Sequence, residues 1–425
     1  MKPGISPWLG MAMSAALLAA SPAFAAPLQP TTPAEVGLSA ERLSRLDTHL
    51  QNLIDDGAFP GAITMVLRDG KIAHLSTLGK RTEGGEPMTE DTIFRIYSMS
   101  KPIVSVAAMM LVEEGKLSIS DPVAKYFPEY KEMTVATGKA ADGTIETVKA
   151  ERTMTVQDLL RHTSGLTYGF FGAGPAREAL NAKEVFNGKH TSQQAARMLG
   201  ELPLEHEPGT TWEYSRSTDV LGAVIEVVEG KSLQEVLSER LFKPLGMNDT
   251  AFWVADASQH GRIAEPNATD NKIGVNPMFD PKVKPVFESG GGGLVSTIHD
   301  FARFAQMLMN GGQLDDVRIL SPYTVSYMTS DHMGEKIKPG KYYLPGAGYG
   351  FGLGFGVRTE AGVSPVMGSV GEYNWGGAGG TYYFADPQEK MVVIYMMQSP
   401  KYRVPLRTQL RSMVYGAFNQ SIDIR

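Results

Sequence analysis

The chain has 425 residues, of which 42% are apolar and 20% are charged, a net charge of −6 and no cysteine. This length and composition indicate a globular protein of two or three domain-sized units with an ample core. The lack of cysteine excludes thiol catalysis, disulfides and thiolate metal sites, and an acidic chain without basic runs argues against nucleic acid or an anionic membrane surface as a partner. The eight histidines form no H-E-x-x-H motif or close pair, so we expect neither a metal site nor a cofactor.

The first 25 residues have the features of a signal peptide. Lys2 supplies a positive charge, an apolar stretch covers residues 11–20, and residues 23–25 form an A-x-A cleavage signal. The apolar stretch is too short to span a membrane. We therefore expect an exported protein, periplasmic or secreted, whose mature chain begins near Ala26 and contains no membrane span. A cytoplasmic N-terminus without structure is the alternative.

The next segment predicts a helix that is followed by a hairpin. Ser39 precedes a run with leucines at helical spacing, and a glycine ends this run. Two β-rich runs, residues 62–67 and 72–78, flank Asp69-Gly70, which is the strongest short signal for a hairpin. A helix before an antiparallel hairpin is typical of an α+β layer.

The middle of the chain is predicted to be mostly helical. The predicted helices cover residues 156–161, 176–187, 191–200, 217–228, 232–241 and 298–310. Residues 254–290 are expected to form a long irregular excursion.

The C-terminal part turns β-rich again and closes with a helix. The β-rich runs cover residues 349–357, 365–370, 381–384 and 391–397, and the helix covers residues 405–418. We therefore predict one antiparallel sheet that is built from both chain ends and flanked by the terminal helices, with a mainly helical domain inserted. The α/β domain would comprise residues 26–120 and 345–425 and the helical domain residues 121–344, and their boundary is expected to form the active-site cleft.

Ser98 and Lys101 form an S-x-x-K motif between a β-rich run, residues 92–97, and a helix that starts near Pro102. A spacing of three places both side chains on one face of a helix. A serine hydroxyl needs a base to become a nucleophile, and a lysine is such a base only when it is neutral. Burial and the positive end of the helix dipole both disfavour the ammonium form, which would make Lys101 a base. The motif alone is equally compatible with a capping serine and a solvated lysine.

Two further motifs lie downstream. Tyr214 stands in a turn before a predicted helix, and a phenol with cations nearby can act as a base or a proton shuttle. Trp375-Gly376-Gly377 belongs to a glycine-rich stretch, which lets a substrate approach the backbone closely. Taken singly, these motifs are also compatible with a packed core tyrosine and an ordinary glycine-rich loop.

Together, the three motifs resemble those of the family VIII carboxylesterases, which belong to the class C β-lactamase and penicillin-binding protein superfamily. Further segments that look like family segments are residues 94–102, 159–166, 244–250 and 291–297. The resemblance covers most of the chain after the signal peptide. It implies a serine β-lactamase-like fold, which agrees with the α+β layout predicted from the residues.

The resemblance also implies roles for the motif residues. Ser98 would be the acylated nucleophile, and Lys101 and Tyr214 would share its proton and pass it to the leaving alkoxide. Tyr214, hydrogen-bonded to Lys101, would then activate the water that removes the acyl group. The backbone N–H groups of Ser98 and Ala378 would form the oxyanion hole.

Departures from the family pattern bear on the substrate. Trp375, Gly376 and Gly377 stand where β-lactamases carry Lys-Thr-Gly, whose lysine attracts a substrate carboxylate, so an apolar wall replaces a cation. We therefore expect short- to medium-chain acyl esters as small-molecule substrates. Arg216 could still attract an anion, so weak hydrolysis of β-lactams such as cephalosporins or nitrocefin is the expected side activity.

Tyr168, Phe170 and Phe171 are the expected walls of the acyl pocket, because of their position and aromatic character. The alternative functions are a class C-like β-lactamase or D,D-peptidase, an acyltransferase, and an inactive penicillin-binding-like sensor. His162 invites a Ser-His-Asp triad, but the chain contains no G-x-S-x-G motif, so we interpret this histidine as part of a structural corner.

Overall fold

The computed structural model describes Met1 and residues 26–274 and 276–419. The predicted signal peptide therefore lies, apart from Met1, outside the described residues. Within the described ranges, no helix is long and apolar enough to cross a membrane.

A seven-stranded antiparallel sheet forms the centre of the fold, in the order β13-β14-β15-β16-β17-β1-β2. Its strands are β1 (Gly61–Arg68), β2 (Lys71–Gly79), β13 (Tyr349–Phe351), β14 (Gly356–Arg358), β15 (Tyr373–Gly376), β16 (Tyr382–Asp386) and β17 (Met391–Met397). The two chain ends meet where β1 pairs with β17, with Ala62 opposite Met397. The predicted sheet built from both chain ends is thus confirmed.

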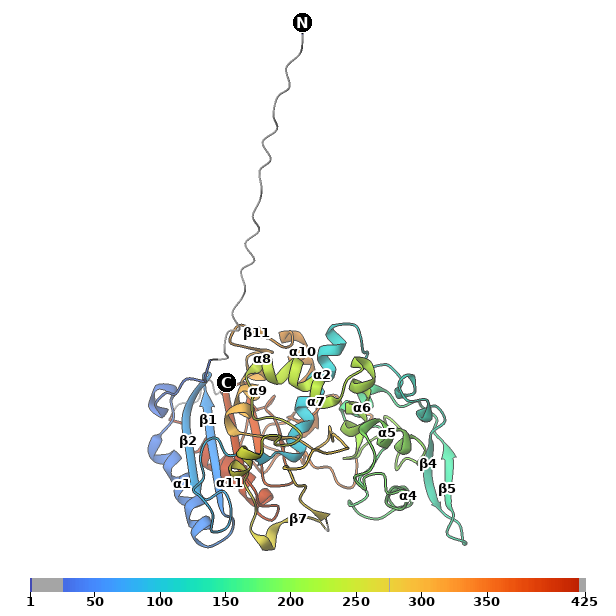
Figure 1. Ribbon diagram of the computed structural model, residues 1–425, viewed down its shortest axis with the longest axis horizontal. Helices are drawn as coiled ribbons and strands as arrows, with labels where there is room; N and C mark the ends of the chain where they lie inside the picture. Colours follow the sequence, from blue (N-terminus) through green and yellow to red (C-terminus); the bar gives the residue numbers. More distant parts are fainter. Residues whose placement is uncertain (2–25, 275, 420–425) are drawn as a thin grey trace.

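The predicted terminal helices, α1 (Ala40–Asp55) and α11 (Arg403–Tyr415), cover one face of this sheet. Ser39 caps α1 by accepting a hydrogen bond from the Arg42 N–H, as the sequence indicates. Leucines of both helices pack on alternate residues of β1 and β17 in one apolar core. In Figure 1, α1 and α11 lie beside β1 and β2 at the left of the molecule.

A larger apolar core lies on the other sheet face, where α2 (Ser100–Glu113) and α9 (Ile298–Met309) pack. The other helices are α3 (Val156–Leu160), α4 (Pro175–Ala182), α5 (Ser192–Gly200), α6 (Ser217–Glu229), α7 (Leu233–Leu237), α8 (Lys243–Leu245) and α10 (Pro322–Met328). The short strands are β3 (Phe94–Arg95), β4 (Thr134–Lys139), β5 (Ile145–Lys149), β6 (Thr211–Trp212), β7 (Lys272–Ile273), β8 (Asn276–Pro277), β9 (Val295–Ser296), β10 (Gln313–Leu314), β11 (Val317–Arg318) and β12 (Lys338–Pro339). Figure 1 shows α4, α5 and α6 with the β4–β5 hairpin at the right, on the side away from β2.

Several predicted elements differ from those observed. The predicted strand at residues 365–370 is wrong, because the carbonyls of Val366 and Met367 accept from Arg358 and Arg411 instead of joining a ladder. The run at residues 349–357 is two strands, β13 and β14, joined by a tight turn. The β4–β5 hairpin was missed because it is largely exposed and lacks an apolar face.

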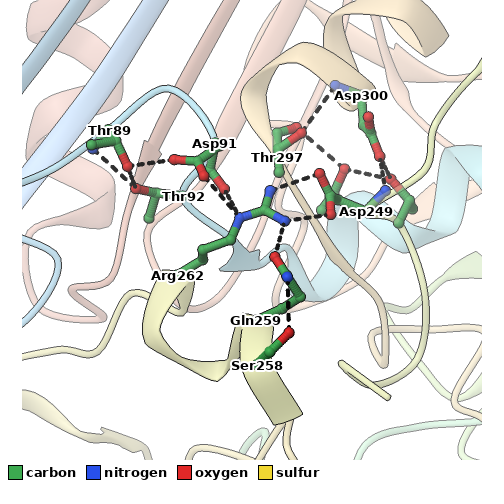
Figure 2. Close-up of polar contacts among 11 residues, drawn as sticks. Thr89, Asp91, Thr92, Asp249, Ser258, Gln259, Arg262, Thr297 and Asp300 are labelled. Carbon is green, nitrogen blue, oxygen red and sulfur yellow. Dashed lines mark hydrogen bonds and ion pairs between the residues drawn. The ribbon is translucent and has the colours of Figure 1, made fainter. Parts of the chain in front are cut away.

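An Arg262 cluster ties the segment before the S-x-x-K motif, at Asp91, to Asp249 (Figure 2). The Arg262 guanidinium pairs with both carboxylate oxygens of Asp249, at 2.8 and 2.7 Å, and with Asp91, at 3.0 Å. Asp300, near the start of α9, accepts hydrogen bonds from the Asp249 N–H and the Thr250 hydroxyl, both at 2.8 Å. These contacts brace the short β3–β9 ladder, and β3 leads directly into the motif.

Candidate active site

Ser98 lies in a 3-10 turn, Tyr97–Met99, and Lys101 lies in the first turn of α2. Tyr97 has a φ of +44°, a conformation that is uncommon and strained for a bulky residue. The bend turns the chain sharply between β3 and α2. Lys101 is fully buried, and its Nζ donates a hydrogen bond to Ser98 Oγ at 3.3 Å. The S-x-x-K pair therefore has a direct contact, and Lys101 is not the solvated lysine of the alternative interpretation.

Lys101 Nζ has two further acceptors. It donates to the Tyr168 hydroxyl at 3.2 Å and to the carbonyl of Gly291 at 2.6 Å. The ammonium group lies over the ring of Tyr214, 4.5 Å from the ring centre. A hydrogen bond between Lys101 and the Tyr214 side chain also contributes to the environment of this lysine, so both Tyr168 and Tyr214 place a phenol beside Nζ.

The pKa of Lys101 differs from the expectation. Burial alone lowers the pKa of this lysine, but the phenol oxygens of Tyr168 and Tyr214 and the carboxylate of Asp219 raise it, and the net pKa lies above its usual value. Burial also raises the pKa of Tyr168, to about 12, although the charge of Lys101 opposes this. The prediction of a neutral Lys101 is therefore corrected: this lysine is an ammonium ion at neutral pH.

Trp375 on β15 also contacts Tyr214. Its indole N–H donates to the Tyr214 hydroxyl at 3.3 Å, and the two ring centres are 5.5 Å apart. Side chains at Gly376 and Gly377 would not fit: a Cβ on Gly376 would collide with the guanidinium of Arg407, and one on Gly377 with Thr381 and the carbonyl of residue 96. The backbone at Gly377 can therefore lie this close to residue 96 only with glycine there, whereas a side chain at Gly376 would require the Arg407 guanidinium to move.

The loop after β15 packs on the segment that carries Ser98. The Thr381 hydroxyl donates to the carbonyl of Ile96, and a Cβ on Gly379 would lie 2.9 Å from the ring of Tyr97. The neighbouring Gly377 N–H is used inside the loop, in a 2.8 Å bond to the Thr381 carbonyl. Ala378, the expected second oxyanion donor, belongs to this loop.

The three expected pocket aromatics form a cluster with the site. Tyr168 stacks on Phe170 with ring centres 4.8 Å apart and lies 5.3 Å from Tyr214, whereas Phe171 lies 6.1 Å from Tyr214. Phe170 is 46% exposed, so it stands at the outer edge of the cluster. Tyr342, which sequence reasoning missed, stacks on Phe171 at 5.9 Å.

Arg216 is paired rather than free. Its guanidinium lies 3.2 Å from a carboxylate oxygen of Asp219 and stacks on the rings of Phe186 and Tyr168, at 3.6 and 4.8 Å. The charge that could attract an anion is therefore balanced locally.

His162 forms a corner, as the sequence indicates. It has a φ of +59°, its carbonyl accepts from the Glu213 N–H, and its Nδ1 lies 3.3 Å from the Ser215 hydroxyl. The ring packs 4.9 Å from that of Tyr214. Burial, aided by the charge of Lys101, holds the pKa of His162 well below its usual value, so this ring is neutral and packs behind Tyr214.

Asp219 and Gly291 were missed by sequence reasoning. Asp219 accepts hydrogen bonds from the Gly291 N–H and the Ser289 hydroxyl. The available signals were an acid five residues after Tyr214 and the glycine run at residues 290–293. In the described part of the chain, no group of three or more His, Cys, Asp or Glu could hold a metal ion.

Comparison with known proteins places the chain among enzymes with related folds. The β-lactamase family pattern matches residues 46–414. Protein Rv1367c of Mycobacterium tuberculosis is 36% identical over 359 residues, which cover 82% of this chain and 88% of that protein. Esterase EstB of Burkholderia gladioli is 29% identical over 418 residues, or 92% of this chain and 99% of EstB. The solved structure of EstCE1, described as a hydrolase with promiscuous acyltransferase activity, superposes with a TM-score of 0.72 at 27% identity and covers 88% of this chain and 99% of that one.

Proposed function

Because the chain belongs to the β-lactamase family, as a family VIII esterase of the serine β-lactamase and penicillin-binding protein superfamily, we propose that it hydrolyses short- to medium-chain acyl esters through an acyl-enzyme on Ser98. The observation that carries this proposal is the contact of Ser98 Oγ with a fully buried Lys101. Two tyrosines contact Lys101, and the indole of Trp375 contacts one of them, Tyr214.

In the acylation step, Ser98 Oγ forms a bond to the ester carbonyl carbon and gives up its proton. Since Lys101 is an ammonium ion that donates to Ser98 Oγ, it cannot accept this proton without first giving one away. The reacting form is therefore the one in which Nζ has first released a proton to solvent, and this neutral Nζ accepts the Ser98 proton with the Tyr168 and Tyr214 hydroxyls beside it to pass the proton on. The carbonyl oxygen takes up negative charge between the N–H groups of Ser98 and Ala378.

Collapse of this intermediate breaks the bond to the alcohol, which takes the proton from Lys101 Nζ, by way of a phenol hydroxyl, as it leaves. The acyl group stays on Ser98. Water then gives a proton to the neutral Lys101 Nζ by the same route and attacks the acyl carbon, and Ser98 Oγ recovers the proton as the acid departs. Deacylation thus uses the same proton relay as acylation, as a reversible proton shuttle requires.

The substrate class follows from the lining of the site. Trp375, Phe171 and Tyr168 provide an aromatic surface around Tyr214, and Arg216 is neutralised by Asp219. A neutral acyl ester loses little hydration free energy on entering such a site. A carboxylate would lose much more, and it would find no unpaired arginine there. Hydrolysis of nitrocefin or cephalosporins is therefore proposed as a weak side activity of the same Ser98.

Acyl transfer to an alcohol is the second candidate. The aromatic surface around Tyr214 would hold an apolar alcohol as readily as the alcohol of the ester, and EstCE1 carries this activity by its description. An added alcohol that competes with water for the acyl-enzyme would reveal a new ester product beside the free acid.

The domain division and export belong to the same proposal. Tyr168 and Tyr214 come from the inserted helical part, residues 121–344, whereas Trp375 comes from the sheet. The site would thus lie at the boundary of the two proposed units, in a protein exported by its N-terminal signal peptide.

The test compares purified wild-type protein with the Ser98→Ala variant on p-nitrophenyl esters of two to twelve carbons and on nitrocefin. We expect rapid turnover of the shorter esters, slow turnover of nitrocefin, and a loss of at least about 10³-fold of both in the variant. Nitrocefin turnover that exceeds ester turnover by orders of magnitude would contradict the proposal, as would an active variant.

A further inference from the structure

Asp219 is a buried carboxylate that the reaction sequence above does not use. It lies in the first turn of α6, and only 3% of its surface is exposed. One carboxylate oxygen accepts from the Ser289 hydroxyl at 2.6 Å and from the Gly291 N–H at 2.9 Å, and the other lies 3.2 Å from the guanidinium of Arg216. A carboxylate with three donors in a buried site is strongly fixed in place.

The segment that Asp219 holds is the one that holds Lys101. The Gly291 carbonyl accepts from Lys101 Nζ at 2.6 Å, the shortest of the three hydrogen bonds of this lysine. The peptide planes on the two sides of Gly291 are thus tied to Asp219 through the N–H and to Lys101 through the carbonyl. A shift of this segment would move the acceptor that keeps Nζ beside Ser98.

The fit between this segment and α6 is close. A Cβ on Gly290 would lie 2.6 Å from the carbonyl of Thr218, and one on Gly291 would lie 3.0 Å from the Asp219 carboxylate. The backbone of the segment therefore rests directly on the first turn of α6. Glycine makes this approach sterically possible, and the Asp219 hydrogen bonds fix its orientation.

We propose that Asp219 is a positioning residue for the reaction: its carboxylate orients the Ser289–Gly291 segment so that the Gly291 carbonyl holds Lys101 Nζ beside Ser98, and its negative charge balances the buried ammonium ion. This inference rests on the proposed function, because Lys101 matters only if Ser98 is the nucleophile. Asp219 does not touch the reacting atoms.

The charges around Asp219 and Lys101 give the direction in which the pH–rate profile should shift when Asp219 is replaced. Arg216 and Lys101 are the cations near Asp219, while Tyr168, Tyr214 and the neutral His162 also face Lys101. The Asp219 carboxylate raises the pKa of both Lys101 and Tyr168, so its removal lowers both values. The acidic and basic limbs of the pH–rate profile should then both move to lower pH.

The experiment uses the Asp219→Asn and Asp219→Ala variants, with Glu226→Gln as the matched control. Asparagine keeps an acceptor oxygen and removes the charge, whereas alanine removes both. Glu226 is also buried on α6 but accepts from the Leu233 N–H at 3.3 Å, away from Lys101. The pH–rate profile of p-nitrophenyl butyrate hydrolysis is measured for each, together with the melting temperature.

We expect Asp219→Ala to lower kcat by about 100-fold with little change in KM, as for a misplacement of about 1 Å in a catalytic group. Asp219→Asn should lower kcat by about tenfold and shift both limbs to lower pH by about half a unit. The control should stay within about twofold of wild type with unshifted limbs.

An Asp219→Asn variant that melts like wild type, with unchanged kcat and limbs, would overturn the inference. A lowered rate with unmoved limbs would also overturn it, because that result is what a merely structural residue gives. If Asp219→Ala does not fold, the asparagine variant decides alone. If wild type hydrolyses no ester, the proposed function fails separately, and the rate of Ser98 labelling by a fluorophosphonate, measured across the same pH range, replaces turnover as the readout.

Discussion

Replacing Tyr168 with phenylalanine removes a single oxygen atom that accepts a hydrogen bond from Lys101 Nζ at 3.2 Å. The stacked contact with Phe170 and the edge-to-face contact with Phe171 do not involve this oxygen, so the wall of the site keeps its shape. A hydrogen bond to a charged group contributes about 1.5–3 kcal/mol. If the relay uses this bond in the transition state, kcat should fall by about 10- to 150-fold, since about 1.4 kcal/mol corresponds to a factor of ten.

The assay is the steady-state hydrolysis of p-nitrophenyl butyrate by Tyr168→Phe, Tyr214→Phe and the double variant. Tyr342→Phe is the matched control, because Tyr342 stacks on Phe171 in the same wall without contacting Lys101. We expect KM to change little and the double variant to lose less than the product of the two single losses, as for residues that share one proton relay. A Tyr168→Phe variant that is as active as Tyr342→Phe would refute the assignment of Tyr168 to the relay.

Three further results are expected. Trp375→Lys should raise the ratio of kcat/KM for nitrocefin to that for p-nitrophenyl butyrate by about tenfold or more, because it places a cation where a carboxylate enters; an unchanged ratio would contradict the role given to Trp375. Phe171→Ala should shift the preferred acyl-chain length, measured on the p-nitrophenyl series, whereas an unaltered preference would remove Phe171 from the pocket. Burial raises the pKa of Asp300 from 3.8 to about 6, so its contribution to stability is complete below pH 3.8 and is lost as pH rises through 6. The unfolding free energy of Asp300→Asn should therefore rise relative to that of wild type between pH 4 and 7, by up to about 3 kcal/mol, and its melting temperature should rise with it. A difference in melting temperature that does not change with pH would contradict this.

Patterns that act over a few residues predicted much of the fold. The Asp69-Gly70 hairpin, the Ser39 cap and the terminal helices are local features, and each is present in the structure. The strand β15 was interpreted as a glycine-rich stretch before a strand, because its glycines carry no propensity for sheet. It is a strand because β14 and β16 flank it and Arg407 occupies the space beside Gly376, neither of which is visible in the sequence.

The site shows the same division between local and distant information. The contact between Ser98 and Lys101 follows from their spacing, and the S-x-x-K motif predicted it. The charge of Lys101 depends on Tyr168, Tyr214 and Asp219, which lie far away in the sequence, so reasoning from burial and the helix dipole gave the wrong protonation state. Tyr168 was identified by its aromatic character as a wall, and its hydroxyl is what brings it to Lys101.

The central claim is that Ser98 is acylated by an ester, and trapping the acyl-enzyme tests it most directly. Wild-type protein is mixed with p-nitrophenyl butyrate, quenched in acid within milliseconds and digested, and the masses of the peptides are measured by mass spectrometry. We predict one added butyryl group on the peptide that contains Ser98, and none on the matching peptide of the Ser98→Ala variant. A butyryl group on another residue, or rapid ester turnover by the Ser98→Ala variant, would contradict the account.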